Sequence, residues 1–217
     1  MSPLKGSVSA TRRRRSHAER TAQTRESIIS AVVDSIAEVG FQRTTAAEIT
    51  RRAGVTWGAV QHHFGGKDGI LLAVLEDSFD RFNRRVASIA ESNMPLEKRI
   101  DLFIDRAWEH FGSAHYRSTL EILMSYAGSN DGDSERVWPG QMFLAWNRVW
   151  QGLFADSVQA RRESLALQKF TISTLTGLAM TALLAGAHTR RPTAELNVLK
   201  SALRNRLASA STSSGGA

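Results

Sequence analysis

Apolar side chains recur every three or four residues through most of the chain, which is the spacing of amphipathic α-helices. The first such pattern predicts a helix over Thr24–Val39, ended by Gly40, a residue type that favours the backbone conformation found just after a helix. The apolar face of this predicted helix consists of Ile28, Ile29, Val32, Val33 and Ile36.

Two short helices are expected next, joined by a tight turn. Thr45 and Glu48 have the spacing of a capping box, in which each side chain bonds a free backbone N–H, so a second helix is predicted to start at Thr45. Gly54 permits a sharp turn, and Thr56 caps a third helix over Trp57–Phe64. Two short helices that meet at a glycine corner are typical of a helix-turn-helix, a motif that binds DNA.

Longer helical patterns follow, and only four prolines interrupt the whole sequence. They cover Asp68–Glu91, Leu96–Gly112, His115–Ala127, Trp138–Asp156, Arg161–Ala187 and Thr193–Ser209. The sequence therefore predicts an all-α fold of about nine helices, with an N-terminal three-helix DNA-binding domain and a larger helical domain. We place a disordered basic arm at residues 1–23, the helix-turn-helix domain at 24–68, the larger domain at 69–208 and a disordered tail at 209–217.

Positive charge is concentrated in the N-terminal third. Residues 1–67 contain 11 Lys or Arg and 5 Asp or Glu, a net charge of +6, whereas residues 68–217 contain 17 and 16, a net charge of +1. A basic end is typical of proteins that bind a polyanion, because each cation that neutralises a phosphate releases a counterion. A solvated basic tail is the alternative interpretation of the same charge.

Cysteine is absent, which excludes disulfides, thiolate nucleophiles and zinc fingers and fits a reducing cytosol. The polar, basic N-terminus lacks the apolar core of a signal peptide, so a cytoplasmic location is expected. Phe170–Ala187 carries no charge, but five Ser or Thr side chains interrupt it, and a buried helix is expected there rather than a membrane span. No cofactor or metal site is expected, because the adjacent His62 and His63 lack a carboxylate or thiolate cluster.

A series of landmarks between Thr24 and Phe82 resembles the DNA-binding region of the TetR/AcrR family of bacterial regulators. In chain order they are Gly40-Phe41, Thr44-Thr45, Glu48-Ile49, Ala53-Gly54-Val55-Thr56, Gly58, His62-His63-Phe64, Lys67 and Ile70-Leu71-Leu72. The resemblance implies three DNA-binding helices followed by about six more, in agreement with the helix count. It does not identify a ligand, because the C-terminal domain varies widely among family members.

The resemblance implies that the third helix enters the major groove, with its first turn at the base edges. Thr56, Trp57, Gly58 and Gln61 occupy those positions, and Thr44, Thr45, His62, His63 and Lys67 occupy positions that contact phosphates. The amide of Gln61 can both donate to and accept from adenine, and Trp57 offers an apolar surface to a thymine methyl group. Gln61 replaces the tyrosine usual in the family, and Trp57 is bulkier than usual, so the operator sequence is not predicted. Arg12 to Arg15 form either a minor-groove arm or a disordered tail attracted to DNA.

Large apolar side chains gather in the larger domain, where four of the five tryptophans lie between residues 108 and 150. Packing in a helical core accounts for any single one of them. Together they favour a pocket for a flat or hydrophobic small molecule. The predicted lining residues are Phe103, Trp108, Phe111, Met124, Phe143, Trp146 and Trp150, and the polar candidates for orienting a ligand are His110, His115, Glu121, Tyr126 and Asn147.

A homodimer is expected, because a lone recognition helix reads too short a sequence and two-fold pairing doubles the site. The last two helices, at about 161–208, are the expected interface. Gly177, Ala179 and Ala182 would allow close approach of two copies. A leucine stripe on the last helix, Leu196, Leu199, Leu203 and Leu207, is predicted to take part.

These features predict a transcriptional repressor that binds a pseudo-palindromic operator as a dimer and is released by a small hydrophobic or aromatic effector. The alternative is a DNA-binding adaptor whose C-terminal domain binds a protein partner. An enzyme is not expected, because the sequence contains no serine nucleophile elbow, phosphate-binding loop or HExxH motif.

Overall fold

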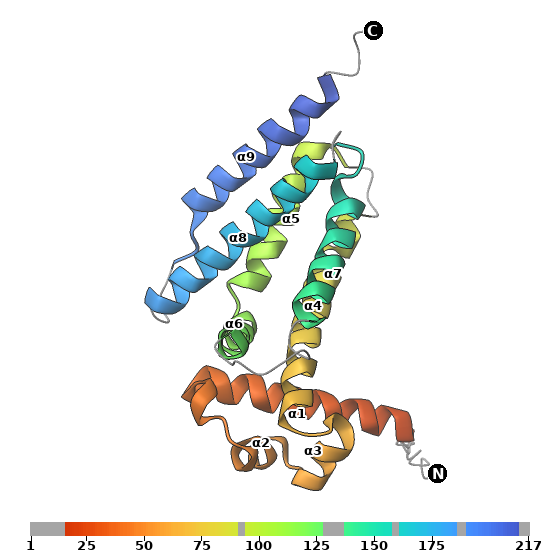
Figure 1. The fold of residues 1–217 in the computed structure, drawn as a ribbon, viewed down its shortest axis with the longest axis vertical. Coiled ribbons are helices and arrows are strands. Elements are labelled where there is room, and N and C mark those ends of the chain that lie inside the picture. The colour runs from red at the N-terminus through yellow and green to blue at the C-terminus, as the bar shows by residue number, and fades with distance from the viewer. Residues whose placement is uncertain (1–15, 91–93, 128–136, 158–160, 186–189, 213–217) are drawn as a thin grey trace, which may run out of the picture.

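The computed structural model describes residues 16–90, 94–127, 137–157, 161–185 and 190–212. Within these ranges the regular structure is entirely helical, with nine α-helices and one short 3₁₀ helix (Figure 1). The prediction of an all-α fold with about nine helices is confirmed. No helix in the same ranges is long and apolar enough to cross a membrane.

The N-terminal unit contains the first helices of the chain. Helix α1 (His17–Val39) lies across the base of the molecule in Figure 1, and η1 (Phe41–Arg43) leads to α2 (Ala46–Ala53) and α3 (Trp57–Phe64). Helix α4 (Lys67–Ala90) then leaves this unit and continues into the second part of the molecule. One continuous helix therefore connects the two parts.

The second part, here called the helical body, combines the second half of α4 with the remaining helices. These are α5 (Leu96–Phe111), α6 (Ala114–Ala127), α7 (Val137–Phe154), α8 (Arg161–Ala185) and α9 (Thr193–Thr212). Helix α5 packs against α4, α8 and α9, and α7 packs along α4. Helix α6 lies between α1 and the rest of the body (Figure 1). Except for the start of α1, the helices begin and end close to their predicted residues.

Helix α1 begins earlier than its apolar pattern indicates. Ser16 and Glu19 form a capping box, in which Glu19 N donates to Ser16 Oγ over 3.2 Å and Ser16 N donates to Glu19 Oε2 over 2.7 Å. The prediction of a disordered arm is therefore wrong for residues 17–23, whose exposed turns carry no apolar stripe. The predicted disordered tail is likewise wrong for residues 209–212, which belong to α9. Arg12 to Arg15 lie outside the described residues.

Two apolar cores share α4. Its first half contributes Ile70 and Val74 to the core of the N-terminal unit, and its second half contributes Phe82 and Val86 to the core of the body. The predicted domain boundary at residues 68–69 therefore precedes the turns of α4 that complete the N-terminal core. That core also includes the fully buried Ile122 of α6, so a helix of the body takes part in the folding of the N-terminal unit.

Candidate nucleic-acid interface and neighbouring pockets

A turn of defined geometry joins α2 to α3. The Thr45 hydroxyl begins α2 by accepting a hydrogen bond from Glu48 N over 3.2 Å. Gly54 ends α2 in a left-handed conformation, with φ 67° and ψ 33°, which glycine adopts without the steric cost of a Cβ. The Thr56 hydroxyl then begins α3 by accepting from Ala59 N over 3.3 Å. Local hydrogen bonds and one glycine thus produce the predicted helix-turn-helix.

Helix α3 has one packed face and one exposed face. Val60 is fully buried on the packed face, and Trp57 is partly buried against the N-terminal core. The exposed face presents Thr56, Gly58, Gln61 and His62. Among the described atoms, a Cβ added at Gly58 would meet only Thr56 Oγ1, at 3.8 Å, so the fold itself does not require this glycine. In helix-turn-helix proteins the second helix of the motif presents such an exposed face to the major groove.

Thr44 differs from its neighbour Thr45, which is exposed. The Thr44 side chain is 4% exposed, and its hydroxyl donates to the Gly40 carbonyl oxygen over 3.0 Å and lies 3.0 Å from Ser35 Oγ. This burial corrects the prediction that the Thr44 side chain contacts a phosphate. Its hydroxyl instead ties the segment before α2 to α1.

His63 lies at the end of α3 and is partly buried. Burial, followed by the neighbouring His62 and Arg25, lowers the pKa of His63 below its usual value, which favours a neutral imidazole. Arg25 of α1 donates to the His63 carbonyl oxygen over 2.7 Å and lies 4.4 Å from the centroid of the Phe64 ring. Arg25 thereby holds the end of α3 against α1, a role that no local sequence signal indicates.

An ion-pair network fixes α2 against α1. Glu48 pairs with Arg51 at 2.7 Å and with Arg52, which also pairs with Glu38 of α1 at 2.6 Å. Hydrogen bonds from the two arginines hold the pKa of Glu48 at about 2. The predicted capping box is therefore only half formed, because the Glu48 carboxylate binds these arginines instead of the backbone N–H of Thr45.

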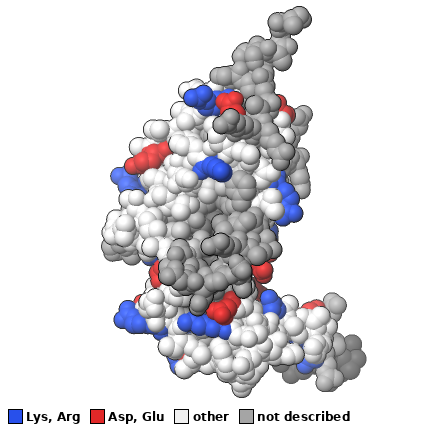
Figure 2. All heavy atoms as spheres, in the orientation of Figure 1, with Lys and Arg blue, Asp and Glu red and all other residues white. Residues whose placement is uncertain are grey.

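Most of the positive excess of the N-terminal third precedes the described residues. Residues 1–15 carry five Lys or Arg and no acidic residue, whereas residues 16–67 carry six basic and five acidic ones. Figure 2 accordingly shows basic and acidic side chains together on the N-terminal unit. Lys67 is exposed at the start of α4, with its Nζ 5.4 Å from the centroid of the Phe41 ring. Over residues 16–67 the basic residues thus exceed the acidic ones by only one.

Several of the predicted ligand-binding aromatic residues pack on one another. Phe103 and Trp150 are 0% and 1% exposed, and their ring centroids lie 6.2 Å apart. The ring centroid of Trp146 lies 4.2 Å from that of Phe82 of α4. Phe103, Trp146 and Trp150 thus belong to the core of the body and line neither of the two pockets described here.

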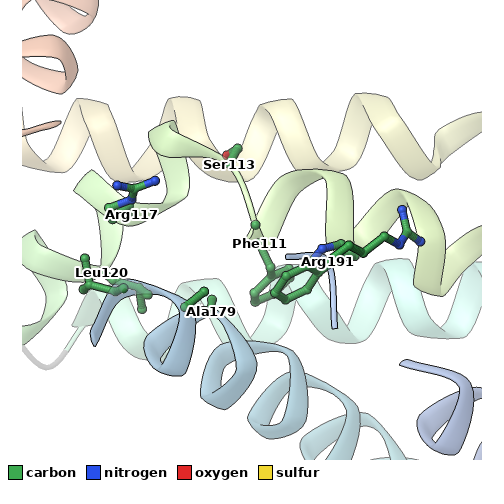
Figure 3. Close-up of a pocket in the computed structure, with 10 residues that line it drawn as sticks. Phe111, Ser113, Arg117, Leu120, Ala179 and Arg191 are labelled. Carbon is green, nitrogen blue, oxygen red and sulfur yellow. The ribbon is translucent and has the colours of Figure 1, made fainter. Parts of the chain in front are cut away.

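The other predicted lining residues divide into two groups. Met124 is 53% exposed and lies at neither pocket, and the side chains of Phe143 and Tyr126 lie outside the described set. Trp108 and Phe111 do line a pocket of about 290 Å³ between α5, α6 and α8, here called the α5–α6–α8 pocket (Figure 3). Its other lining residues are Gly112, Ser113, Arg117, Leu120, Ala179, Ala182, Leu183 and Arg191.

A second, more open groove of about 360 Å³ lies between α4 and α7. Its described lining is mainly apolar, with Asn83 and Arg148 as polar members. Of the predicted ligand-binding residues whose side chains are described, none contributes to this α4–α7 groove. The remaining lining residues are Phe79, Val86, Ala87, Ala145, Val149, Gly152 and Leu153.

Two polar side chains that the sequence predicts to orient a ligand, on α5 and α6, instead make contacts within the fold. His110 is 4% exposed, and its ring centroid lies 5.1 Å from that of Tyr116 and 5.5 Å from that of Phe82. Burial among these rings lowers the pKa of His110 to about 3. His115 Nε2 lies 3.4 Å from Asp77 Oδ2 of α4, and burial also lowers the pKa of this histidine.

Helix α6 joins the body to the N-terminal unit. Ser118 Oγ donates to the Val33 carbonyl oxygen of α1 over 3.0 Å, and Glu121 Oε2 accepts from Phe41 N over 2.9 Å. Ile122 is buried in the N-terminal core, whereas other residues of α6 line the α5–α6–α8 pocket. These contacts join distant segments and have no signature in the local sequence, so the sequence does not predict them.

The leucine stripe of α9 packs within the chain. Leu196, Leu199, Leu203 and Leu207 are at most 1% exposed and belong to the core of the body, where α9 packs against α5. The prediction that this stripe forms a dimer interface is therefore wrong. Ala179 of α8 is also buried, while Gly177 is exposed.

Comparison with known proteins identifies the family. Residues 28–74 match the family described as bacterial regulatory proteins, tetR family. Over 142 residues the chain is 33% identical to the uncharacterized HTH-type transcriptional regulator Rv2912c of Mycobacterium tuberculosis, with 58% of this chain and 73% of that protein aligned. The chain belongs to the TetR family. This family consists of bacterial regulatory proteins. The chain spans 56% of the length of another relative, the HTH-type transcriptional regulator CymR of Pseudomonas putida, at 28% identity over 113 residues, which are 52% of this chain.

Other transcriptional regulators match a shorter part of the sequence or the fold alone. HTH-type transcriptional regulator BetI 1 of Chromohalobacter salexigens is 42% identical over 72 residues, which cover 31% of this chain and about a third of BetI 1. The TetR-family regulator SCO4454 of Streptomyces coelicolor has a TM-score of 0.66 at 16% identity, covering 88% of this chain and 97% of its own. FadR of Bacillus subtilis in complex with stearoyl-CoA has a TM-score of 0.63 at 16% identity, covering 85% and 98%. The likeness of fold thus extends beyond the helix-turn-helix into the helical body.

Proposed function

We propose that this TetR-family protein is a dimeric repressor that reads an inverted-repeat operator through α3 and leaves it when a small molecule occupies the α5–α6–α8 pocket. The observation that carries the proposal is the position of α6, which lines this pocket and also contributes Ile122 to the N-terminal core. A ligand that displaces α6 would displace α1, against which α2 packs. Pocket and operator are then coupled through one helix.

The exposed face of α3 supports the reading of bases. Gln61 offers a donor and an acceptor on one amide, which suits adenine, and Gly58 leaves room for close approach to the groove. Around this face, we expect Thr45, His62, His63 and Lys67 to contact phosphates, which fix the position of the protein on the duplex.

The outer faces of α8 and α9 support dimerisation in place of the buried leucine stripe. Phe170, Leu184 and Val198 are 49%, 81% and 70% exposed, and large apolar side chains that gather on one surface are typical of protein–protein interfaces. Between Phe170 and Leu184 the exposed face of α8 is uncharged, with Ser173, Gly177 and Thr181 as small members that allow close helix packing. Two copies that meet on these faces would place two α3 helices on one duplex.

A small-molecule effector is supported by the location of the α5–α6–α8 pocket next to the aromatic core. FadR, which shares the fold, is known in complex with stearoyl-CoA. In the present chain the first turns of α6 meet the pocket, and its later turns meet α1 and the N-terminal core. The same helix therefore senses the pocket and supports the DNA-binding unit.

The proposal is tested by selecting duplexes from a random pool with the purified protein at near-physiological salt and by measuring the mass of the selected complex with light scattering. We expect an inverted repeat bound by two chains or a multiple of two. Phe170→Asp should give a monomer that no longer selects the repeat, whereas Leu144→Asp, on an exposed residue of α7, should remain dimeric.

Recovery of a single, unrepeated motif, or of duplexes with no common sequence, would contradict the proposal. An inverted repeat that no small molecule releases, bound by a protein that co-purifies with a second polypeptide, would favour the adaptor alternative.

A further inference from the structure

We propose that the α5–α6–α8 pocket is selective for small amphipathic carboxylates, with Arg117 binding the carboxylate and the aromatic wall of α5 binding the apolar part. The inference deepens the proposed effector role and rests on it for any consequence at the operator. Three features of the pocket support it: the charge of its lining, the ion-pair partners of its arginines, and its volume.

The apolar side of the pocket is made by α5 and α8. Trp108 and Phe111 provide aromatic surfaces, and Ala179, Ala182 and Leu183 of α8 provide small and aliphatic ones. Figure 3 shows Phe111 and Ala179 between Arg117 and Arg191. An aromatic or aliphatic group of a ligand would therefore bind between two cationic side chains.

Among the described residues, the charged lining residues of the pocket are both arginines, and no carboxylate lines it. Arg191 pairs with Asp105 of α5, but Lys200 Nζ lies 2.9 Å from the same carboxylate, so two cations share one anion. Within the described part of the chain, no carboxylate lies within ion-pair distance of Arg117. The pocket thus has an excess of positive charge, and the guanidinium of Arg117 is available to a bound anion.

The start of α6 adds to this preference. Ser113 lines the pocket, and its hydroxyl accepts from Tyr116 N over 3.1 Å at the first turn of α6. The N-terminal end of a helix carries partial positive charge, so a carboxylate near Ser113 and Arg117 would be favoured by the helix as well as by the guanidinium. Arg117 lies one turn into the same helix and before Ser118, which bonds α1.

The pocket volume limits the ligand to a small molecule. About 290 Å³ is at the lower end of the range for ligand pockets, which favours compact acids over long acyl chains. The α4–α7 groove contrasts with it, because its described lining is mainly apolar and contains Arg148 as its one arginine. The two sites should therefore prefer different ligands. The same substitution made in each site shows which of them binds the acid.

The test uses isothermal titration calorimetry of the full chain with two acids, naphthoate and octanoate, each beside its neutral amide. We expect each acid to bind at least about tenfold more tightly than its amide, because charge-assisted hydrogen bonds to the guanidinium are lost in the amide. Arg117→Gln should remove most of this preference and leave binding of the amides unchanged. Arg148→Gln makes the same change in the α4–α7 groove and should leave the preference intact.

Equal affinities for acids and amides would overturn the inference, as would loss of the preference in Arg148→Gln but not in Arg117→Gln. Absence of saturable binding by both acids at millimolar concentration would also overturn it. Acid binding that depends on Arg117 but does not change operator affinity would support the inference and refute the proposed effector role. The two proposals can thus fail separately.

Discussion

Helices α3 and α5 differ in what their side chains face. Helix α3 fully buries Val60 and presents polar side chains to solvent, whereas α5 buries seven of its residues, among them Phe103, Trp108 and Phe111. On α3, a residue that does not serve the core is free to contact DNA. On α5 the buried aromatic residues pack in the core, and of these Trp108 and Phe111 also line a described pocket. An aromatic residue at helical spacing is therefore weak evidence for a ligand site, while an exposed polar residue on a short helix after a glycine turn is stronger evidence for a DNA contact.

The largest expected effect is the loss of stability when a buried aromatic residue of α5 is truncated. Phe103→Ala should lower the free energy of unfolding by about 3–5 kcal/mol, because it removes a fully buried ring and leaves a cavity. Urea denaturation measures this loss. Met124→Ala, at an exposed position that the sequence assigns to the same pocket, should change stability by less than about 0.5 kcal/mol. A small decrease in the free energy of unfolding for Phe103→Ala would contradict the assignment of Phe103 to the core.

The buried His110 should make the stability of the body depend on pH. Because burial holds its folded-state pKa at about 3, the unfolded chain binds the proton more readily, and stability falls as the pH drops below the ordinary histidine pKa. Between pH 7 and pH 5 this effect should cost about 2 kcal/mol.

His110→Gln removes the titrating group, so the variant should lose about that much less stability than the parent chain over the same interval. Urea denaturation at both pH values measures the difference. Parallel pH dependence of the two proteins would show that His110 does not stay neutral in the folded state.

Local signals in the sequence predict the N-terminal unit well. Thr45, Gly54 and Thr56 define the helix-turn-helix through bonds and backbone conformations that involve neighbours only, and the structure confirms the bounds of α3. The burial of Thr44 and the contact of Arg25 with α3 depend on α1, many residues away, and no local pattern encodes them. For the same reason the local sequence predicts that the leucine stripe of α9 contacts a second copy of the chain, although α5 of the same chain covers it.

On the recognition side, Gln61→Ala and Lys67→Ala should separate base reading from phosphate binding. Gln61→Ala should reduce discrimination at one base pair of each half-site by about 1–3 kcal/mol. Lys67→Ala should weaken binding to all sequences alike and reduce the slope of log affinity against log salt by about one. Titrations of the selected duplex and its single-base variants at several salt concentrations measure both effects. Indistinguishable results for the two substitutions would contradict these roles.

Gly58→Ala sharpens the comparison by opposing fold and function. The added methyl group makes only an ordinary van der Waals contact, with Thr56 Oγ1 at 3.8 Å, and improves helix propensity, so the free energy of unfolding should rise by about 0.5–1 kcal/mol. Operator affinity should nevertheless fall, because the methyl group occupies the space at which α3 approaches the groove. Urea denaturation and operator titration of the same preparation measure both. Unchanged operator affinity would place Gly58 away from the DNA.

The central claim is that occupancy of the α5–α6–α8 pocket is transmitted to the N-terminal unit through α6. Operator affinity of Ala182→Phe tests it most directly, because the larger side chain fills the pocket without a ligand, and Ala87→Phe places the same group in the α4–α7 groove. Both variants should stay dimeric by light scattering. We predict that Ala182→Phe lowers operator affinity by at least about fivefold, while Ala87→Phe binds as the parent chain does. Full operator affinity in Ala182→Phe, or loss of affinity in Ala87→Phe alone, would contradict the claim.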